Sequence, residues 1–187
     1  MSGKLIVICA PSGTGKSTLL SHLKEDHPDL QWSISCTTRA MRPGEINGKD
    51  YHFITVSDFE KQIADKEFIE WAIVHSNYYG TSKKFVDEGL KLGKKMLFDL
   101  DVQGVDSMKA IYGKEAHVIF IEPPSIEELE KRLRTRGTDP DHVIKERVSN
   151  AQRELKRKND FDYLVLNDDV NEAYKKLNEI VTCLLNA

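Results

Sequence analysis

The segment Ala10-Pro-Ser-Gly-Thr-Gly-Lys-Ser17 has the residue types of a loop that binds phosphate groups. In a G-x-x-x-x-G-K-[ST] loop, small residues let backbone N–H groups converge on phosphate oxygens, the lysine reaches the β- and γ-phosphates, and the hydroxyl holds Mg²⁺. Gly15, Lys16 and Ser17 match this pattern, whereas Ala10 stands in place of its first glycine. The alternative is a glycine-rich turn that happens to contain Lys-Ser. We favour the phosphate loop, which predicts a phosphotransferase that uses ATP.

Two acids follow a second apolar run of the chain. Met96-Leu-Phe-Asp99 is three apolar residues followed by an acid, the Walker B pattern that holds Mg²⁺ in such phosphotransferases. Asp101 comes two residues later, so in a continuing strand it points to the same face, about 7 Å further along. The alternative is a pair of turn aspartates at the end of a strand. We expect Ser17 and Asp99 to hold the metal.

The order of predicted elements can position these groups. The loop lies between a predicted strand at Leu5–Ala10 and a predicted helix at Lys16–Asp26, as its mechanism requires. Strands and helices alternate again after residue 95, and one helix opens with a capping box of Ser125 and Glu128. The elements predicted here are strands at Met96–Asp101, His117–Ile121 and Tyr163–Leu166, and helices at Ser125–Thr135, about 140–158 and Val170–Leu185. This order predicts an α/β fold with a parallel sheet flanked by helices.

Residues 33–95 have a different pattern, with short alternating strands. The strands are predicted at Gln31–Cys36, Tyr51–Thr55 and Phe68–Val74. A helix with a capping box at Ser57 and Glu60 lies between the last two strands, and a helix at Ser82–Leu92 ends the region. We therefore expect a small mixed α+β insertion in the parallel fold.

The composition is that of one compact globular domain, with 187 residues, 40% hydrophobic and 30% charged. The apolar run Leu5–Ala10 is too short for a membrane span or a secretory signal, so we expect a cytoplasmic protein with no membrane partner. Cys9, Cys36 and Cys183 form no CxxC pair and no cluster with metal-ligand spacing. We expect them to be reduced thiols in the core.

The charge is unevenly distributed. From Lys131 to Lys158 there are ten Lys/Arg against four Asp/Glu, so this segment carries +6 and the rest of the chain −9. A basic segment on an acidic chain indicates a part that meets a polyanion. The interleaved aromatics and the basic overall charge that favour nucleic-acid binding are both missing, and a nucleoside triphosphate fits instead.

The chain resembles the guanylate kinases over essentially its whole length. The resemblance is carried by A-P-S-G-T-G-K-S-T at 10–18, S-C-T-T-R-A-M-R-P-G-E at 35–45, N-G-K-D-Y at 47–51, F-I-E-W-A at 68–72, N-Y-Y-G-T at 77–81, D-L-D-V-Q-G at 99–104, R-L-R-T-R-G-T at 132–138 and V-L-N-D-D at 165–169. It implies one domain over 1–187, with a P-loop kinase core at about 1–33, 96–125 and 159–187. A GMP-binding subdomain is implied at about 34–95 and a helical lid at about 126–158.

The resemblance implies a reversible reaction of purine nucleotide metabolism, in which ATP phosphorylates GMP or dGMP with Mg²⁺. On the ATP side, it implies that the lid arginines close on the phosphates and adenine, and that Lys16 and Arg39 complete the catalytic set. The lid arginines are Arg132, Arg136 and Arg147. The implied ATP-binding residues are Ala10, Pro11, Ser12, Gly13, Thr14, Gly15, Lys16, Ser17 and Thr18, with Asn167 and Asp168 near the adenine.

The phosphate of a nucleoside monophosphate is a dianion that guanidinium and phenol groups bind well. Arg39, Arg42, Tyr51 and Tyr79 offer such groups, and the resemblance places all four on the GMP phosphate. The residue types alone leave open solvated arginines and packed tyrosines.

Guanine offers N1–H and N2–H₂ donors that a carboxylate accepts, whereas N1 of adenine is itself an acceptor. Glu70 is expected to share a strand face with Phe68, Ala72 and Val74, which is an unusual place for an acid. The resemblance assigns Glu70 to the base. The other residues that it implies for GMP are Ser35, Glu45, Thr81 and Asp101.

Two other functions remain open at this point. Some guanylate-kinase-like domains of scaffold proteins bind peptides without catalysis; intact Lys16, Arg39 and Asp99, and the lack of adjoining interaction domains, favour an enzyme. A different phosphate acceptor, such as another nucleotide or a sugar phosphate, is the other alternative, and Glu70 favours guanine. The sequence leaves open whether the protein is a monomer or a homodimer.

Overall fold

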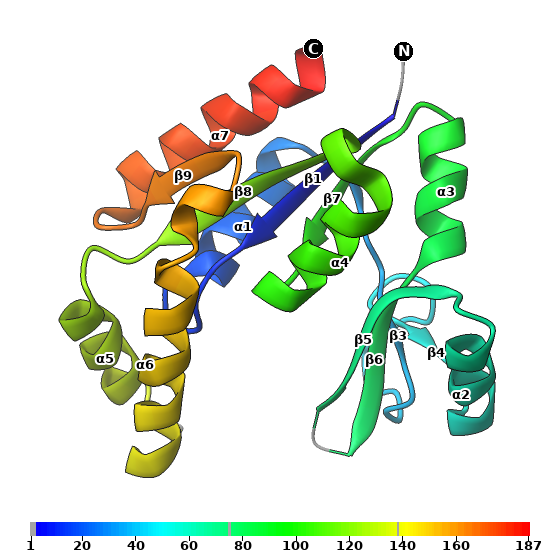
Figure 1. The fold of residues 1–187 in the computed structure, drawn as a ribbon, viewed down its shortest axis with the longest axis horizontal. Helices are drawn as coiled ribbons and strands as arrows, with labels where there is room; N and C mark the ends of the chain where they lie inside the picture. The colour runs from blue at the N-terminus through cyan, green and yellow to red at the C-terminus, as the bar shows by residue number, and fades with distance from the viewer. Residues whose placement is uncertain (1–2, 75, 138) are drawn as a thin grey trace. The chain divides into compact units, whose positions relative to one another are not determined.

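The computed structural model describes residues 3–74, 76–137 and 139–187 (Figure 1). Thr138, the last residue of the 132–138 block, lies outside the described residues. A five-stranded sheet has the order β2-β7-β1-β8-β9. Its strands are β1 (Lys4–Cys9), β2 (Gln31–Trp32), β7 (Lys95–Asp99), β8 (Ala116–Glu122) and β9 (Tyr163–Leu166). The pairs β2–β7 and β8–β9 are parallel, with Gln31 opposite Met96 and Ile119 opposite Tyr163. The predicted α/β fold with a parallel sheet flanked by helices is confirmed.

A second, four-stranded sheet has the order β4-β3-β6-β5. Its strands are β3 (Cys36–Thr37), β4 (His52–Phe53), β5 (Phe68–Val74) and β6 (Asn77–Ser82). The pair β3–β4 is parallel, and β6 is antiparallel to both β3 and β5, so the sheet is mixed.

One strand prediction in this region was wrong, and one strand was missed. The segment Gln31–Cys36 is not one strand, because Gln31–Trp32 belongs to the five-stranded sheet and Cys36–Thr37 to the four-stranded sheet. Strand β6 was not predicted, although its sequence N-Y-Y-G-T-S contains two tyrosines. Asn and Gly lower its intrinsic strand propensity, and it forms between two strands that satisfy its backbone on both sides.

The helices are α1 (Lys16–Asp26), α2 (Val56–Ala64), α3 (Lys83–Lys91), α4 (Val102–Tyr112), α5 (Ile126–Thr135), α6 (Asp141–Leu155) and α7 (Val170–Asn186), with 3₁₀ turns η1 (Gly113–Glu115) and η2 (Lys158–Asp160). Helix α4 was not predicted. The prediction that Asp101 continues the strand on the same face as Asp99 was wrong, because β7 ends at Asp99 and Asp101 lies in the loop before α4. No helix in the described ranges is long and apolar enough to cross a lipid bilayer.

One predicted helix cap is present and one is displaced. Ser125 caps α5 and accepts a hydrogen bond from the Glu128 N–H at 3.1 Å. Helix α2 begins before the predicted box at Ser57, and its cap is Thr55, whose hydroxyl accepts from the Asp58 N–H at 3.0 Å. The Thr55 hydroxyl also donates to the Asp58 carboxylate at 2.6 Å, so both groups at this helix end are satisfied.

The chain divides into two compact units. The first unit comprises Met1–Leu5, Gln31–Phe98 and Gln103–Ala116. The second comprises Ile6–Leu30, Asp99–Val102 and His117–Ala187. The residues from Ser35 to Thr81 that the resemblance implies for GMP therefore belong to the first unit, and the predicted phosphate loop and the basic segment belong to the second.

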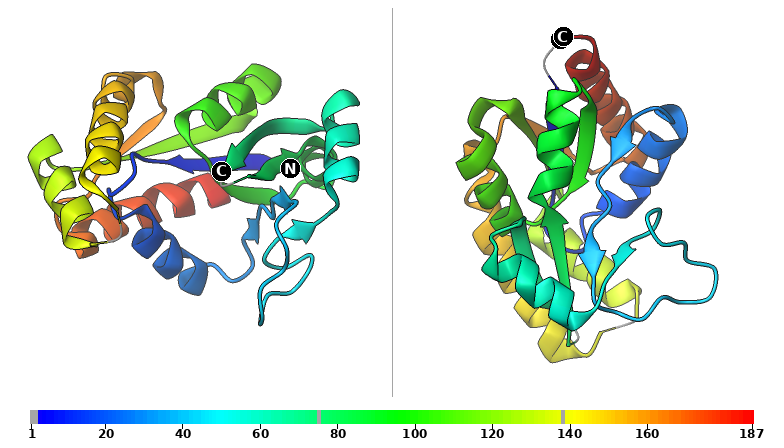
Figure 2. Two further views of the ribbon diagram at one scale, coloured as in Figure 1. Left: turned by 90° about the horizontal axis from the view of Figure 1, so that it is seen from below. Right: turned by 90° about the vertical axis from the view of Figure 1, so that its right-hand side faces the viewer.

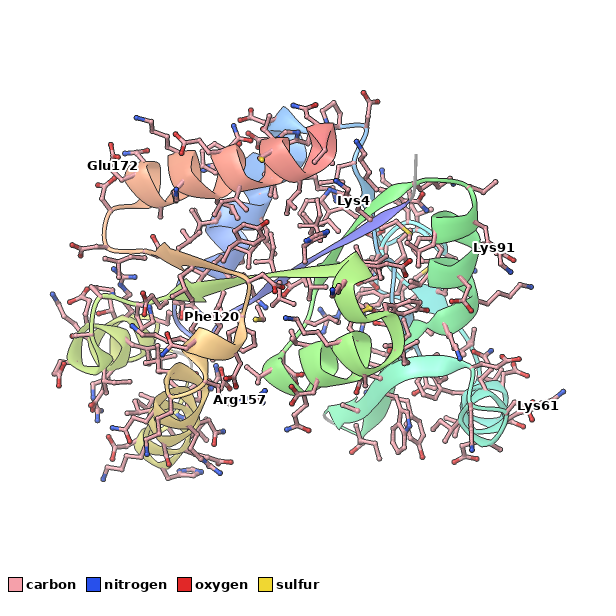
Figure 3. The ribbon with its side chains drawn as sticks, turned by 45° about the horizontal axis from the view of Figure 1, so that its top comes forward. Lys4, Lys61, Lys91, Phe120, Arg157 and Glu172 are labelled. Carbon is pink, nitrogen blue, oxygen red and sulfur yellow. The ribbon has the colours of Figure 1, made fainter. Side chains whose placement is uncertain are left out.

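The second unit has its core along β1 and β8, whose side chains are buried on both faces, as a covered parallel sheet requires. Figure 3 shows Phe120 of β8 inside this unit; it is fully buried and stacks on Phe161 at a centroid distance of 4.9 Å. Figures 1 and 2 show α1 beside α7 and α5 beside α6. Helices α5 and α6 share a separate apolar cluster that includes Leu129, Leu133 and Ile144.

The first unit has a small aromatic core beneath its mixed sheet. Phe59 of α2 is fully buried and stacks on Phe68 at 4.2 Å and on Tyr78 at 5.0 Å between ring centroids. Cys36 packs into the same cluster. These contacts join α2 to β3, β5 and β6.

The cysteines are free thiols, but not all are in the core. Cys9 and Cys36 are buried, as predicted, whereas Cys183 is exposed on α7, so that part of the prediction was wrong. Burial raises the pKa of Cys9 to about 12 and that of Cys36 to about 11, so both stay protonated at neutral pH.

We predict that Phe59→Ala lowers the free energy of unfolding by about 3–5 kcal/mol, because it removes a fully buried ring that no neighbour can replace. Phe59→Leu retains part of the volume and costs about 1.5 kcal/mol. Urea denaturation at 25 °C measures both. Leu92→Ala, at a side chain that is 71% exposed, is the control and changes stability by less than about 0.5 kcal/mol. An equally small loss for Phe59→Ala contradicts this account of the core.

Candidate active site

The predicted phosphate loop joins β1 to α1 through a turn that only glycine adopts easily. Gly13 and Gly15 have φ of 93° and 95°, in the left-handed region. Between them, Thr14 is fully buried, and its N–H and hydroxyl both donate to the Pro11 carbonyl, at 3.2 and 2.7 Å. No side chain caps the start of α1, and its first turn has no acid. This helix N-terminus is therefore ready to receive an anion.

Ala10, the departure from the motif, does not strain the loop. The non-glycine residues with positive φ in the described ranges are Lys66 and Ser76, so Ala10 has an ordinary backbone conformation. A methyl group at this position carries no conformational penalty.

Lys16 reaches from the start of α1 to the end of β7. Its ammonium group makes an ion pair with the Asp99 carboxylate and lies 3.4 Å from the Leu100 carbonyl oxygen. The Asp99 side chain is 48% exposed. The two motifs that the sequence singled out independently, the phosphate loop and the strand-end acid, are therefore in contact.

The donor set is compatible with Mg²⁺. Ser17 is exposed in the first turn of α1, and Asp99 is half exposed beside Lys16. No cluster of three or more His, Cys, Asp or Glu with metal-binding geometry occurs among the described residues. Mg²⁺ commonly takes one or two protein oxygens and completes its shell with phosphate and water, so these two groups fit it.

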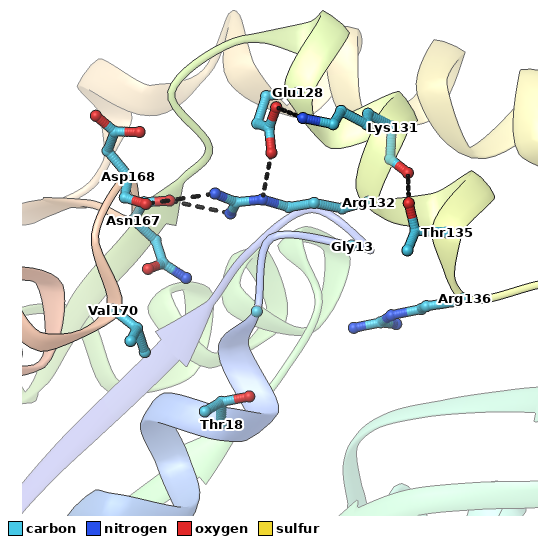
Figure 4. A pocket seen from close by; sticks show the side chains of 11 residues that line it. Gly13, Thr18, Glu128, Lys131, Arg132, Thr135, Arg136, Asn167, Asp168 and Val170 are labelled. Carbon is cyan, nitrogen blue, oxygen red and sulfur yellow. Dashed lines mark hydrogen bonds and ion pairs between the residues drawn. The ribbon is translucent and has the colours of Figure 1, made fainter.

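A pocket of about 580 Å³ adjoins the phosphate loop (Figure 4), within the usual range for small-molecule sites. Asn167 and Asp168, the residues implied to lie near the adenine, are part of its wall. The complete lining is Gly13, Gly15, Thr18, Glu128, Lys131, Arg132, Thr135, Arg136, Asn167, Asp168 and Val170. All belong to the second unit.

The three arginines that the resemblance places in a lid have different surroundings. Arg132 donates to the carbonyls of Asn167 at 3.0 Å and of Thr14 and Asp168 at 3.5 Å, and pairs with Glu128 at 3.4 Å. Figure 4 shows Arg136 extending from the end of α5. Its side chain makes no hydrogen bond or ion pair with another described residue, so it can receive a ligand.

Arg147 of α6 approaches the phosphate loop from another element. It donates to the Ser12 hydroxyl at 2.8 Å and lies 3.5 Å from Asp139. The basic segment thus contacts the loop through both of its helices, Arg132 at Thr14 and Arg147 at Ser12.

Arg39 is the centre of a cluster in the first unit. Its guanidinium donates to Glu45 at 2.6 Å and lies 5.6 Å from the ring centroids of both Tyr51 and Phe53. Tyr51 in turn contacts Tyr79 edge to face at 5.9 Å. Hydrogen bonds to Glu45 first, and then to Tyr79, raise the pKa of Arg39. Three of the residues implied for the GMP phosphate are thus together.

Glu45 joins this cluster in its ionised form. Its carboxylate accepts from Arg39 and from the Arg42 N–H, the latter at 2.7 Å, and these bonds lower its pKa, Arg39 most strongly. Because the folded-state pKa is lowered, this stabilisation is present at neutral pH and is lost as the pH falls through the lowered value.

Glu70 points away from the aromatic core because of a β-bulge. Phe68 lies opposite Ser82 and Glu70 opposite Thr81, so the register shifts by one between them. The expectation that Glu70 and Phe68 share a face was therefore wrong: consecutive residues of β6 point to opposite faces, and so do their partners. The Thr81 hydroxyl donates to the Glu70 carboxylate at 2.6 Å.

Three further residues implied for GMP have other surroundings. The Arg42 side chain is exposed, and Arg42 contributes its backbone N–H to Glu45. Ser35 precedes β3, and its carbonyl accepts from the His52 N–H at 2.9 Å. Asp101 belongs to the second unit.

In the second unit, sequence reasoning missed one functional candidate, Glu154, and one contact of Asn167, a residue that the resemblance had already implied for the adenine. The Asn167 side chain is buried and bonds to the phosphate loop, at the Thr14 carbonyl. Glu154 of α6 is a half-buried acid near Lys16; burial first, and the charge of Asp101 second, raise its pKa, while Lys16 lowers it. Nothing in the pattern around Glu154 distinguishes it from other acids of a charged helix.

Comparisons with known proteins agree with this geometry. A family model described as guanylate kinase matches residues 2–183. The chain is 49% identical over 181 residues to a guanylate kinase of Idiomarina loihiensis, covering 96% of this chain and 86% of the relative. It is 45% identical over 180 residues to a guanylate kinase of Carboxydothermus hydrogenoformans, covering 96% and 88%. The crystal structure of guanylate kinase from Anaplasma phagocytophilum is similar, with a TM-score of 0.69 and 30% identity over 97% of this chain and 86% of that one.

We predict that Arg39→Gln raises the pKa of Glu45 toward the ordinary value of a glutamate, because the strongest cause of its lowering is removed. A carboxyl-carbon NMR titration of labelled glutamate measures this shift. Lys49→Gln removes a positive charge from the same exposed loop and leaves the Arg39–Glu45 bond in place, so it is the control for net charge. An unchanged Glu45 titration in Arg39→Gln contradicts the ion pair.

Proposed function

The chain belongs to the guanylate kinase family, and from this premise we propose that it transfers the γ-phosphoryl group of ATP to GMP or dGMP, with Mg²⁺, giving ADP and GDP or dGDP. The observation that carries the choice of acceptor is the face of the four-stranded sheet that bears Tyr79, Thr81 and Glu70. Tyr79 and Thr81 are two residues apart on β6, about 7 Å along the strand. The Arg39 cluster at one end suits a phosphate and the Glu70 carboxylate at the other suits a base, which are the two ends of a nucleoside monophosphate.

Guanine is the base that these groups favour. The Glu70 carboxylate accepts from Thr81 and retains acceptor capacity for the N1–H and N2–H₂ donors of guanine. Adenine would leave its N1 acceptor facing a carboxylate. A site built on such hydrogen bonds rejects the wrong base strongly, because its own polar groups are then unpaired.

On the donor side, the phosphate loop and the pocket beside it suit ATP. In this proposal the loop from Ala10 to Thr18 holds the phosphate chain, Lys16 exchanges its ion pair with Asp99 for phosphate oxygens, and the pocket receives the adenosine. Ser17 and Asp99 would hold Mg²⁺, which supplies positive charge to the β- and γ-phosphates when bound.

Phosphoryl transfer requires alignment and positive charge more than proton transfer. The attacking group is a phosphate oxygen of GMP, which is already an anion, so the chemistry needs no general base. Lys16, Arg136 and Arg147 can stabilise the charge that spreads over the transferred group, and Arg136 has the freest side chain of the three. Residues 126–158 would act as a lid that excludes water, 34–95 as the acceptor subdomain, and the remainder as the core.

The test of this function is ADP formation from ATP with GMP, dGMP, AMP, UMP, CMP or TMP, with and without Mg²⁺. We expect turnover with GMP and dGMP, dependent on Mg²⁺, and at least a hundredfold lower kcat/KM with AMP. A different preferred acceptor contradicts the assignment of the base site. No turnover with any acceptor supports a peptide-binding domain instead.

The same assay tests the role of Glu70. We predict that Glu70→Gln lowers kcat/KM for GMP about a hundredfold and narrows the difference from AMP, because an amide NH₂ then faces the donors of guanine. Glu88→Gln, at an exposed acid of α3 in the same unit, is the matched control and keeps wild-type selectivity. Wild-type discrimination in Glu70→Gln rules out this role.

A further inference from the structure

Asn167 is one of few buried polar side chains in the described ranges, and its position is fixed by the sheet. It is 5% exposed and follows β9 directly. Its backbone N–H donates to the Glu122 carbonyl, at the end of the neighbouring strand β8, at 2.8 Å. The Asn167 side chain therefore extends from a backbone position that is hydrogen-bonded to the sheet.

The side-chain amide of Asn167 forms a hydrogen bond with the phosphate loop. Its Nδ2 donates to the Thr14 carbonyl oxygen at 2.6 Å in a buried bond. Arg132 is a second, longer donor to the same carbonyl, at 3.5 Å, and also binds the Asn167 carbonyl at 3.0 Å. The Thr14 N–H and hydroxyl both donate to the Pro11 carbonyl, so all polar groups of Thr14 have hydrogen-bond partners. These bonds fix the orientation of the peptide that joins Thr14 to Gly15.

The direction of the Thr14 carbonyl decides the direction of the next N–H. No cis peptide bond occurs in the described part of the chain, and in a trans peptide C=O and N–H point to opposite sides. Because the Thr14 carbonyl points to Asn167, the Gly15 N–H points away from Asn167. A flip of this peptide would turn an N–H donor toward the Nδ2 donor, and these repel.

Steric contact reinforces this arrangement. A Cβ atom placed on Gly15 would lie 2.6 Å from Asn167 Nδ2, so the amide packs directly against the glycine that precedes Lys16. The lack of a side chain at Gly15 thus serves the approach of Asn167 as well as the left-handed backbone.

We infer that Asn167 is a positioning residue of the phosphate loop, whose amide fixes the Thr14–Gly15 peptide so that the Gly15 N–H is presented to the phosphate chain of ATP. This inference rests on the proposed function for the identity of the phosphate ligand. It differs from a contact between Asn167 and the adenine, which the resemblance to the family implies. The two roles make opposite predictions for a ligand that has phosphates but no base.

The experiment compares the binding of ATP and of inorganic tripolyphosphate by titration calorimetry, without acceptor. We expect Asn167→Ala to weaken both ligands by the same factor, about tenfold, as the loss of one hydrogen bond allows. The KM for GMP stays as in the wild type. Asn171→Ala, at an exposed asparagine of α7 outside the pocket lining, is the matched control and binds both ligands normally.

Tripolyphosphate binding that is unchanged in Asn167→Ala overturns the inference, and weakened ATP binding alone then assigns Asn167 to the base. Asn167→Leu fills the same space but has no hydrogen-bond donor, and we expect it to weaken binding as Asn167→Ala does. It replaces Asn167→Ala if the cavity left by alanine unfolds that variant. If circular dichroism shows both variants unfolded, Asn167 is a structural residue and the inference fails. A wild-type chain that binds both ligands but phosphorylates no GMP removes the proposed function and leaves the inference intact.

Discussion

The left-handed turn at Gly13 and Gly15 constrains the whole second unit. A Cβ atom on Gly13 would lie 2.9 Å from the Leu133 side chain of α5, and one on Gly15 would lie 2.6 Å from the Asn167 amide. The two glycines thus give the backbone its left-handed turn and also let α5 and the loop after β9 pack on that turn. The predicted phosphate loop, α5 and the pocket beside the loop meet at these two glycines.

In the first unit, the corresponding constraint is the bulge in β5. The extra residue lets Phe68 fill the aromatic core under the sheet while Glu70 points to the other face with Thr81. Without it, strict alternation would bury Glu70 beside Phe59 or expose Phe68. One residue of register thus separates the buried Phe68 from Glu70, which we propose binds the base, and the Arg39–Glu45 ion pair lies in the cluster that we propose binds the phosphate.

Local signals in the sequence predicted the parts of the structure that are decided locally. The loop before Lys16, the cap at Ser125 and the strand at Tyr163–Leu166 each depend on neighbouring residues, and all are present. The pairing of β6 with β3 and the bond from Asn167 to Thr14 join residues far apart in the chain, so neither spacing nor propensity predicts them. The Arg39 cluster could be predicted in part. Its residue types indicated phosphate binding, but the bond between Arg39 and Glu45 became evident only from the fold.

In the proposed reaction, this chain moves a phosphoryl group between two nucleotides and keeps water out. Phosphorus-31 NMR of a mixture of ATP, GMP, Mg²⁺ and the protein tests this directly, because each phosphorus atom is followed separately. We expect the ADP and GDP signals to grow in equal amounts while those of ATP and GMP fall, with no inorganic phosphate. Inorganic phosphate that grows without GDP, or an unchanged GMP signal while ATP is consumed, would contradict it.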